Sequence, residues 1–387
     1  MNSSLNELPK FLRPSLKMFL SVDLIGSTKL KHDENALKYN PESEKSFEAT
    51  SSIWFKALID FYSGFEVMFA EAWRHAFTDD GIAEPRWPND KQPNPSLWKI
   101  NGDELIYVLE IVHPGQIATA LYAWRHALLS YRRFLRDTKS RLDLKATAWM
   151  AGFPIGNHEV AFWSDLSDAT PDLSEHAGQY GQYYRLNEWY EAQENNSKSD
   201  YVKDYIGPAV DTGFRLSAYA TAHRFPVSME IAYFLSKIDY DGKPIAEIGL
   251  KYHGKENLKG VLGGSPYPIF WIDTSSPDDE LVKAENKLLG TQESCSLFDV
   301  REYVTLFFND EKNILFRPFI YNCKDIQYAD IPQEYEKKIY QRFQVWKLEK
   351  EKLKIQNDLS PPDDHVETKI IDRKQMKALF SDKFKKL

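Results

Sequence analysis

The sequence is poor in cysteine and has no long apolar run. Its 387 residues include two cysteines, Cys295 and Cys323, too few for a disulfide framework and spaced unlike a zinc site. No apolar run approaches the roughly 20 residues that a membrane-spanning helix needs. The opening residues, MNSSLNELPKFLRP, lack the apolar stretch of a secretion signal. These absences predict a cytoplasmic protein without a membrane span.

Positive charge is not in excess either. The chain carries 49 Lys and Arg against 57 Asp and Glu, a net charge of −8 at pH 7. This balance argues against a nucleic-acid partner bound mainly through phosphates, although a few local cations suffice for a single polyphosphate. Aromatic residues reach 14%, with 10 Trp, which predicts a large core first and a flat-ligand pocket or dimer interface second.

The order of apolar patterns predicts an α+β fold. Residues 17–24 (KMFLSVDL) have the pattern of a buried strand that ends in a glycine-containing loop. Residues 97–111 contain two apolar runs around Asn101-Gly102, a strong hairpin signal. Further strands are predicted at 144–155, continuing through 159–163, and at 225–228, 247–253 and 267–273; helices at about 43–76, 116–138 and 207–223. Hairpins mixed with strand–helix alternation predict a sandwich with a mainly antiparallel sheet.

Two segments interrupt this pattern, and the end of the chain departs from it. The proline-rich stretch near 77–96 and the polar, tyrosine-rich stretch near 167–199 are predicted to be insertions. The expected catalytic domain is 1–275. Residues 276–387 form a partly helical C-terminal extension, whose main element is a charged amphipathic helix at about 331–359.

Two carboxylates stand where metal chemistry is possible. Asp23 lies at the end of a predicted central strand, and Asp103 follows the hairpin tip at Gly102. Such a pair can hold two divalent ions about 3.5–4 Å apart for in-line displacement at phosphorus. Alone, each of these residues is more often a turn or capping residue than a metal ligand. After Asp23, the backbone of Gly26 and the hydroxyls of Ser27 and Thr28 can cradle phosphate oxygens.

Four motifs together resemble one family. FLSVDLIGST resembles the first metal-binding motif of the class III nucleotidyl cyclases, the adenylate and guanylate cyclase family. WKINGDEL resembles the hairpin with that family's second metal Asp, DYIGPAVDTGFRLS its ribose- and phosphate-binding helix, and ENLKG a late hairpin with a triphosphate-binding Lys. Each motif is weak alone, but the four occur in family order between residues 17 and 273.

The resemblance implies a metal site and a class III cyclase-type sandwich. Asp23 and Asp103 match the metal carboxylates, and Leu24 matches the residue that offers its backbone carbonyl. The implied cofactors are two divalent ions, Mn²⁺ or Mg²⁺. The family builds each site from two subunits, so a head-to-tail homodimer with shared active sites is implied.

The resemblance also implies catalytic residues. Arg215 matches the Arg that stabilises charge on the α-phosphate, and Lys259 matches the triphosphate Lys, with Lys255 as the alternative. Asp211 lies four residues before Arg215 and so on the same helix face. It stands where most family members carry Asn, and it can accept a hydrogen bond from the ribose.

Lys99 and Asp204 match the base-selecting residues of the adenylate branch. A cationic donor beside a carboxylate acceptor suits adenine, cytosine and uracil, and it suits guanine poorly. Trp98 and Tyr205, beside these residues, either narrow the pocket to a pyrimidine or belong to the core.

The insertions, the GFRL sequence and the long C-terminal region resemble the bacterial pyrimidine cyclases of anti-phage defence. This implies conversion of UTP, or less favourably CTP, to the 3′,5′-cyclic monophosphate and pyrophosphate. The product would be a messenger for a separate effector protein. The alternatives are an adenylate cyclase and a catalytically silent nucleotide sensor.

Overall fold

The computed structural model describes residues 4–32, 53–78, 94–165, 179–238, 248–276, 279–291, 293–310 and 315–359. Seven strands form one sheet in the order β2-β3-β1-β4-β7-β9-β8, and only β4 and β7 pair in parallel. They are β1 (Ser15–Ile25), β2 (Ser96–Asn101), β3 (Glu104–Ile111), β4 (Asp143–Phe153), β7 (Arg224–Val227), β8 (Leu250–Glu256) and β9 (Tyr267–Asp273). A second sheet pairs β5 (His158–Trp163) with β6 (Tyr201–Ile206).

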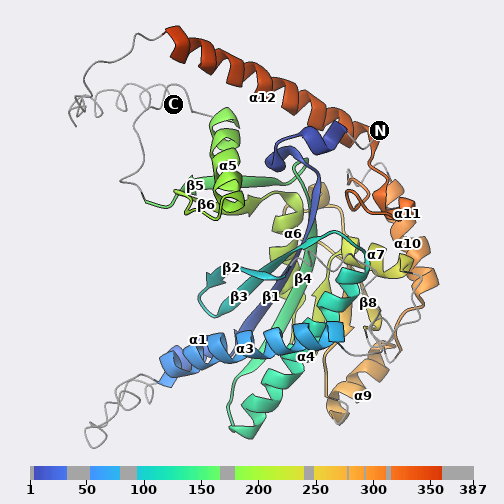
Figure 1. Ribbon diagram of the computed structural model, residues 1–387. Helices are drawn as coiled ribbons and strands as arrows, with labels where there is room; N and C mark the ends of the chain where they lie inside the picture. The colour runs from blue at the N-terminus through green and yellow to red at the C-terminus, as the bar shows by residue number, and fades with distance from the viewer. Residues whose placement is uncertain are drawn as a thin grey trace, which may run out of the picture. The chain divides into compact units, whose positions relative to one another are not determined.

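Helices flank the seven-stranded sheet (Figure 1). The described helices are α1 (Ser27–His32), α3 (Ile53–Thr78), α4 (Gly115–Asp137), α5 (Gln179–Glu194), α6 (Pro208–Leu216), α7 (Met229–Lys237), α9 (Glu280–Leu289), α10 (Leu297–Asn309), α11 (Ile326–Ala329) and α12 (Gln333–Leu359). The predicted α+β fold with a mainly antiparallel sheet is confirmed. Across the described residues, no helix is both long and apolar enough to cross a membrane.

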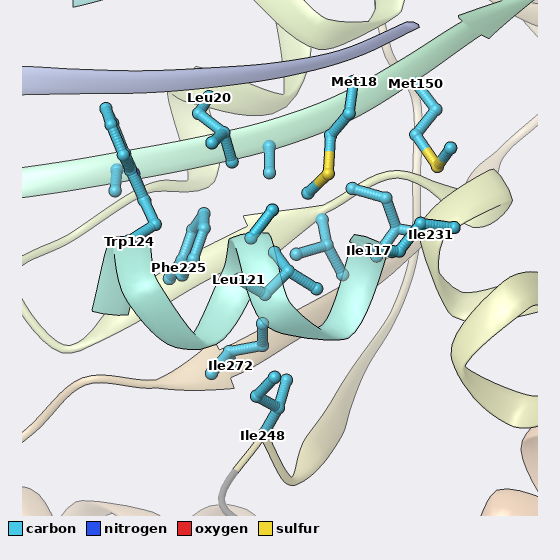
Figure 2. Packing of buried hydrophobic residues seen from close by; sticks show 14 of the residues in the cluster. Met18, Leu20, Ile117, Leu121, Trp124, Met150, Phe225, Ile231, Ile248 and Ile272 are labelled. Atoms are coloured by element: carbon cyan, nitrogen blue, oxygen red, sulfur yellow. The ribbon is translucent and has the colours of Figure 1, made fainter. Parts of the chain in front are cut away.

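Strand β1 separates the two faces of the sheet because successive side chains point in opposite directions. Its even-numbered residues, including Met18 and Leu20, are buried in the main core with α3, α4 and α7. Figure 2 shows Met18 and Leu20 directed at Leu121 and Trp124 of α4. The odd-numbered residues, among them Phe19 and Asp23, point to the opposite face. The Asp23 carboxylate therefore lies on the face away from α4, whereas Leu24, whose backbone carbonyl is the predicted ligand, buries its side chain in the main core.

Several predicted elements have different bounds. Strand β5 does not continue β4, because Pro154 and the turn up to Asn157 redirect the chain into the second sheet. The predicted insertion at 167–199 contains α5, which packs on β5 and β6. The helix predicted to reach His223 ends as α6 at Leu216. Most of the predicted insertion at 77–96 and the start of the helix at 43–76 lie outside the described residues.

Aromatic rings join the second sheet to the odd-numbered face of β1. The ring of Tyr205 on β6 meets Phe19 edge-on, with centroids 5.3 Å apart. The same ring lies 5.4 Å from Phe153 and 5.2 Å from Trp98. Edge-to-face pairs at such separations stabilise beyond the area they bury. They hold β6, and with it the neighbouring Asp204, against the central sheet.

A buried ionic network reinforces this attachment. Lys17 of β1 and Lys203 of β6 both approach Oε1 of Glu159 on β5, at 3.5 and 3.0 Å. The Tyr190 hydroxyl of α5 donates to Oε2 of Glu159 (2.5 Å), and Lys17 also contacts Glu110 at 3.2 Å. The side chains of Lys17 and Glu159 are only 5% and 6% exposed. Water therefore cannot solvate either charge, and each is stabilised by its partner. The network thus links β1, β3, β5, α5 and β6.

The pKa values in this network reflect opposing causes. Burial alone would raise the pKa of Glu159, but attraction to Lys17 and then Lys203, with the Tyr190 hydrogen bond, leaves it lowered. Burial lowers the pKa of Lys203, and the attraction of Glu159 offsets only part of that effect. Glu159 is therefore the carboxylate that keeps two buried cations in place.

Helix α6 approaches the sheet closely at Gly213. A Cβ atom at this position would lie 2.1 Å from Cδ2 of Trp149 on β4. The side chains of Phe214 and Trp149 also meet, with ring centroids 5.5 Å apart. A residue without a side chain is therefore required for α6 to lie this close to the strand.

The C-terminal region belongs to the first compact unit up to Phe343 and contributes residues to the main core as far as Tyr328. Val300 and Val304 of α10 are buried in it, beside α7. The Arg342 guanidinium donates to the Pro154 carbonyl at 2.8 Å. Residues from Gln344 on belong to a second compact unit, in which Lys350 lies 5.8 Å from the Trp346 ring centroid.

We expect Gly213→Ala to lower the free energy of unfolding by about 1–3 kcal/mol, because the new methyl group overlaps the Trp149 ring. Gly152→Ala is the matched control, since a Cβ there meets nothing within 4 Å. Urea denaturation measures both. Equal stability of the two variants would contradict the close approach of α6.

We expect Glu159→Gln to destabilise the fold by roughly 3–5 kcal/mol, because two buried lysines lose their counter-charge. The lowered pKa of Glu159 fixes the pH dependence. The carboxylate's contribution is full above its unfolded pKa of about 4.3 and is lost as pH falls through the folded value. Denaturation at several pH values should therefore show the difference from wild type narrowing in acid. Glu334→Gln, at a largely exposed pair with Lys337, should change stability little; an equally small effect of Glu159→Gln would refute the buried network.

Candidate active site

The two predicted metal carboxylates lie at the same end of the sheet. Asp23 on β1 is paired in register with Glu104, the first residue of β3. Asp103 occupies the turn between β2 and β3, after Gly102, whose φ is +67°. The backbone N–H of Leu24 donates to the Asp103 carbonyl at 3.2 Å. The hairpin predicted at Asn101-Gly102 thus brings Asp103 beside the end of β1.

Each carboxylate has a lysine close by. Lys145 Nζ of β4 lies 2.8 Å from Asp23 Oδ2, and Lys31 Nζ of α1 lies 3.9 Å from Asp103 Oδ1. The Ser27 hydroxyl donates to Asp103 Oδ2. Both aspartate side chains are about a quarter exposed, at 27% and 25%. The carboxylates are thus charge-compensated and still accessible.

This donor set fits a hard divalent cation. Carboxylate oxygens are the ligands that Mg²⁺ and Mn²⁺ prefer, and Mg²⁺ commonly binds through one or two carboxylates plus substrate phosphates. Within the ranges that the structure describes, no group of three or more His, Cys, Asp or Glu residues could hold a metal. Asp23 and Asp103, with the Leu24 carbonyl, are the oxygen donors that would hold such a cation at this end of the sheet.

The predicted phosphate loop is a strand-to-helix turn. Gly26 has a φ of +91°, which favours glycine, and its carbonyl accepts from Leu30 at 3.0 Å. Ser27 begins α1, is buried, and bonds to Asp103. Thr28 is exposed. In this structure Ser27 orients a carboxylate, and Thr28 keeps its hydroxyl open to solvent.

The two predicted base-reading residues are in direct contact. Lys99 Nζ on β2 donates to Asp204 Oδ2 on β6 at 2.8 Å, although 105 residues separate them in sequence. Asp204 Oδ1 accepts from Trp98 Nε1 at 3.0 Å and from the Tyr205 backbone N–H at 2.8 Å. Lys99 also lies 4.6 Å from the centroid of the Trp98 ring. The structure therefore forms this donor–acceptor pair within one chain.

Helix α6 presents Asp211 and Arg215 one turn apart, and both are exposed. The Arg215 carbonyl accepts from the Ser217 backbone N–H, but in the described part of the chain the Arg215 guanidinium makes no hydrogen bond or ion pair. Its neighbour Phe214 lies 6.1 Å from the Trp98 ring centroid. Arg215 therefore lies on the helix that packs beside the base-reading pair, with its guanidinium available to another molecule.

Lys255 and Lys259 are both exposed near the connection between β8 and β9. Lys255 is in β8, with Nζ 5.9 Å from the Tyr303 ring centroid. Lys259 follows the strand and has no ion-pair partner among the described residues. Neither lysine, nor Arg215, makes an ion pair with Asp23 or Asp103 there.

Sequence reasoning missed Lys145 and the role of Trp98. Lys145 is part of the predicted strand at 144–155, but its position opposite Asp23 depends on the register of β1 and β4. The sequence predicts Trp98 only as an aromatic ring of the pocket or the core, whereas in the structure its indole N–H donates a hydrogen bond to Asp204. The alternation of charged and apolar residues in LDLKATAWM was the one available signal for Lys145.

No protein-family model and no curated protein matches the chain. Solved structures similar to it include the adenylyl cyclase CyaB from P. aeruginosa, at 13% identity and a TM-score of 0.39, covering 68% of this chain and 97% of that one. The guanylate cyclase domain of RhGC from Catenaria anguillulae in complex with GTP is 9% identical, with a TM-score of 0.36 and coverages of 67% and 95%. A bacterial light-regulated adenylyl cyclase is 10% identical, with a TM-score of 0.37 and coverages of 72% and 98%. These similarities are remote, so the interpretation of the site depends on this chain's own side chains.

Proposed function

We propose that this chain is a class III-type nucleotidyl cyclase that converts UTP, and less readily CTP, to the 3′,5′-cyclic monophosphate and pyrophosphate. The contact between Lys99 and Asp204 carries the proposal. Lys99 is a hydrogen-bond donor and Asp204 an acceptor for a nucleotide base, and the two meet over the sheet face on which Asp23 lies. The four sequence motifs support the same assignment.

The base-reading pair limits the substrate. Uracil offers O4 to Lys99 and N3–H to Asp204, and cytosine matches through N3 and its amino group. Adenine matches equally through N1 and its amino group, so adenylate cyclase is the second candidate. Tyr205 is buried in an apolar cluster, and Trp98 packs partly buried against it, so the preference for a pyrimidine over adenine rests on the resemblance to the pyrimidine cyclases.

The reaction is an internal displacement at the α-phosphorus. The ribose 3′-hydroxyl gives its proton to water, the 3′-oxygen bonds to that phosphorus, and the bond from phosphorus to the pyrophosphate oxygen breaks. Divalent cations bound at Asp23, Asp103 and the Leu24 carbonyl would acidify the 3′-hydroxyl and offset phosphate charge. Arg215 stabilises the developing negative charge, Lys259 (or Lys255) holds the departing pyrophosphate, and Asp211 accepts from the ribose.

Lys145 joins this set as a phosphate-facing cation. Its ion pair with Asp23 is about a third exposed on each side (33% and 27%). Such a pair contributes little to stability and exchanges partners readily. A cation held by Asp23 would replace this lysine contact, and the Lys145 ammonium would then be available to a phosphate oxygen.

A shared site in a head-to-tail homodimer accounts for the unpaired cations. Arg215 and Lys259 are exposed, and among the described residues neither makes an ion pair with Asp23 or Asp103 of its own chain. Apolar side chains are exposed on the elements that carry the base-reading pair and Arg215: Leu97, Ile100, Val202, Ile206 and Phe214. A second copy would bury this surface and bring its own Asp23 and Asp103 to these cations.

The biological setting follows from the resemblance to the bacterial pyrimidine cyclases. The product would act in the cytoplasm as an anti-phage messenger recognised by a separate effector. Residues 1–275 would form the catalytic domain, and 276–387 the extension. The free thiols of Cys295 and Cys323 suit a reducing compartment.

Incubation of the purified protein and Mn²⁺ with ATP, GTP, CTP or UTP separately, followed by mass analysis, should yield a cyclic pyrimidine nucleotide. Cyclic AMP alone would overturn the pyrimidine assignment and favour the adenylate cyclase. Absence of every cyclic product, despite nucleotide binding, would favour the silent sensor.

Mixing two inactive variants tests the shared site. We expect Asp103→Ala to remove metal binding and Arg215→Ala to lower kcat by roughly 10²–10³-fold. Because one active site of the mixed dimer would be intact, mixing the variants should restore partial activity. Proven subunit exchange without recovery would refute the shared site.

A further inference from the structure

Asp204 has two oxygen atoms in unequal surroundings. Oδ1 accepts two hydrogen bonds, from the Trp98 indole and from the Tyr205 backbone, at 3.0 and 2.8 Å. Oδ2 accepts one, from Lys99 at 2.8 Å. A carboxylate offers about four lone-pair sites, two on each oxygen. The acceptor capacity of Oδ1 is therefore full, and one site remains, on Oδ2.

Trp98 cannot easily turn away from Asp204, because aromatic neighbours fix its ring. Phe19 meets it edge-on at 5.1 Å and Tyr205 at 5.2 Å, and Phe214 of α6 lies at 6.1 Å. The Lys99 ammonium lies over the same ring, 4.6 Å from its centroid. Trp98 thus contacts both base-reading residues and the helix that carries Arg215.

We propose that Trp98 is a specificity-determining residue that restricts Asp204 to a single free acceptor site and thereby excludes guanine. Guanine presents N1–H beside an amino group, and a carboxylate binds this edge best through both oxygens. The indole N–H occupies the oxygen that the second contact needs. Uracil and cytosine each present one hydrogen-bond donor beside one acceptor. The donor needs only the one free acceptor site of Asp204, and the acceptor can bind Lys99.

This inference rests on the proposed nucleotide site, but it concerns selection and not turnover. Exclusion here comes from an occupied acceptor. Loss of the indole N–H should therefore admit guanine even where the ring itself is retained.

Trp98→Phe is the test, because phenylalanine keeps an aromatic ring and removes the N–H. Trp163→Phe is the matched control: Trp163 lies on β5, with its ring against Tyr201 at 4.6 Å. We expect Trp98→Phe to increase GTP binding relative to UTP on the order of tenfold, the worth of one hydrogen bond to a charged group. Trp163→Phe should leave the ratio unchanged.

Two readouts separate this inference from the proposed function. Calorimetric titration with GTP and with UTP in the presence of Ca²⁺ measures nucleotide binding and does not require turnover. Mass analysis of cyclic products measures the reaction. A binding shift toward GTP supports the role of Trp98 even if no cyclic product forms with either protein. An unchanged ratio, an equal loss for both nucleotides, or no binding of either nucleotide to any of the proteins would overturn it.

Discussion

The alternation of side chains along β1 determines where both the core and the site lie. Met18, Leu20 and Val22 bury one face of the strand under α3 and α4. On the other face, Lys17 joins the buried ionic network around Glu159 and Phe19 packs against the Tyr205 ring of β6. Asp23 lies opposite Glu104, the first residue of β3 after the hairpin turn. A slip of one residue would exchange these faces, placing Asp23 in the apolar core and Leu20 in the site. Burial of the large apolar face therefore fixes the register of β1, and with it the position of Asp23.

Acidic groups at the site are already paired with lysines. Asp23 contacts Lys145, Asp103 lies near Lys31, and Asp204 contacts Lys99. All three pairs are partly exposed, so each contributes little to stability. If the proposed site binds a cation at Asp23 and Asp103, or a base at Lys99 and Asp204, breaking these lysine contacts would therefore cost little free energy. The buried pairs around Glu159 differ, because breaking them leaves charges that water cannot reach.

Local patterns in the sequence were sufficient to predict much of the fold. The hairpin at Asn101-Gly102, the helix now seen as α4 and the strand at 267–273 follow from turn chemistry and apolar periodicity. Other features depend on contacts between distant residues. The sequence contains no local signal for the placement of β5 in a separate sheet or for the helix α5. The alternation in LDLKATAWM indicates a strand, but the pairing of Lys145 with Asp23 depends on the register of β1 and β4. The contact of Lys99 with Asp204 was foreseen only through the family resemblance, and the Trp98 hydrogen bond required the structure.

The most direct test is a crystal structure with Mn²⁺ and 3′-deoxy-UTP, which lacks the attacking hydroxyl and so cannot cyclise. The account predicts anomalous Mn²⁺ peaks at Asp23 and Asp103, with the uracil edge between Lys99 and Asp204 of the partner subunit. Arg215 of that same partner should lie at the α-phosphate. Mn²⁺ bound elsewhere, or a nucleotide whose base does not reach Lys99 and Asp204, would contradict it.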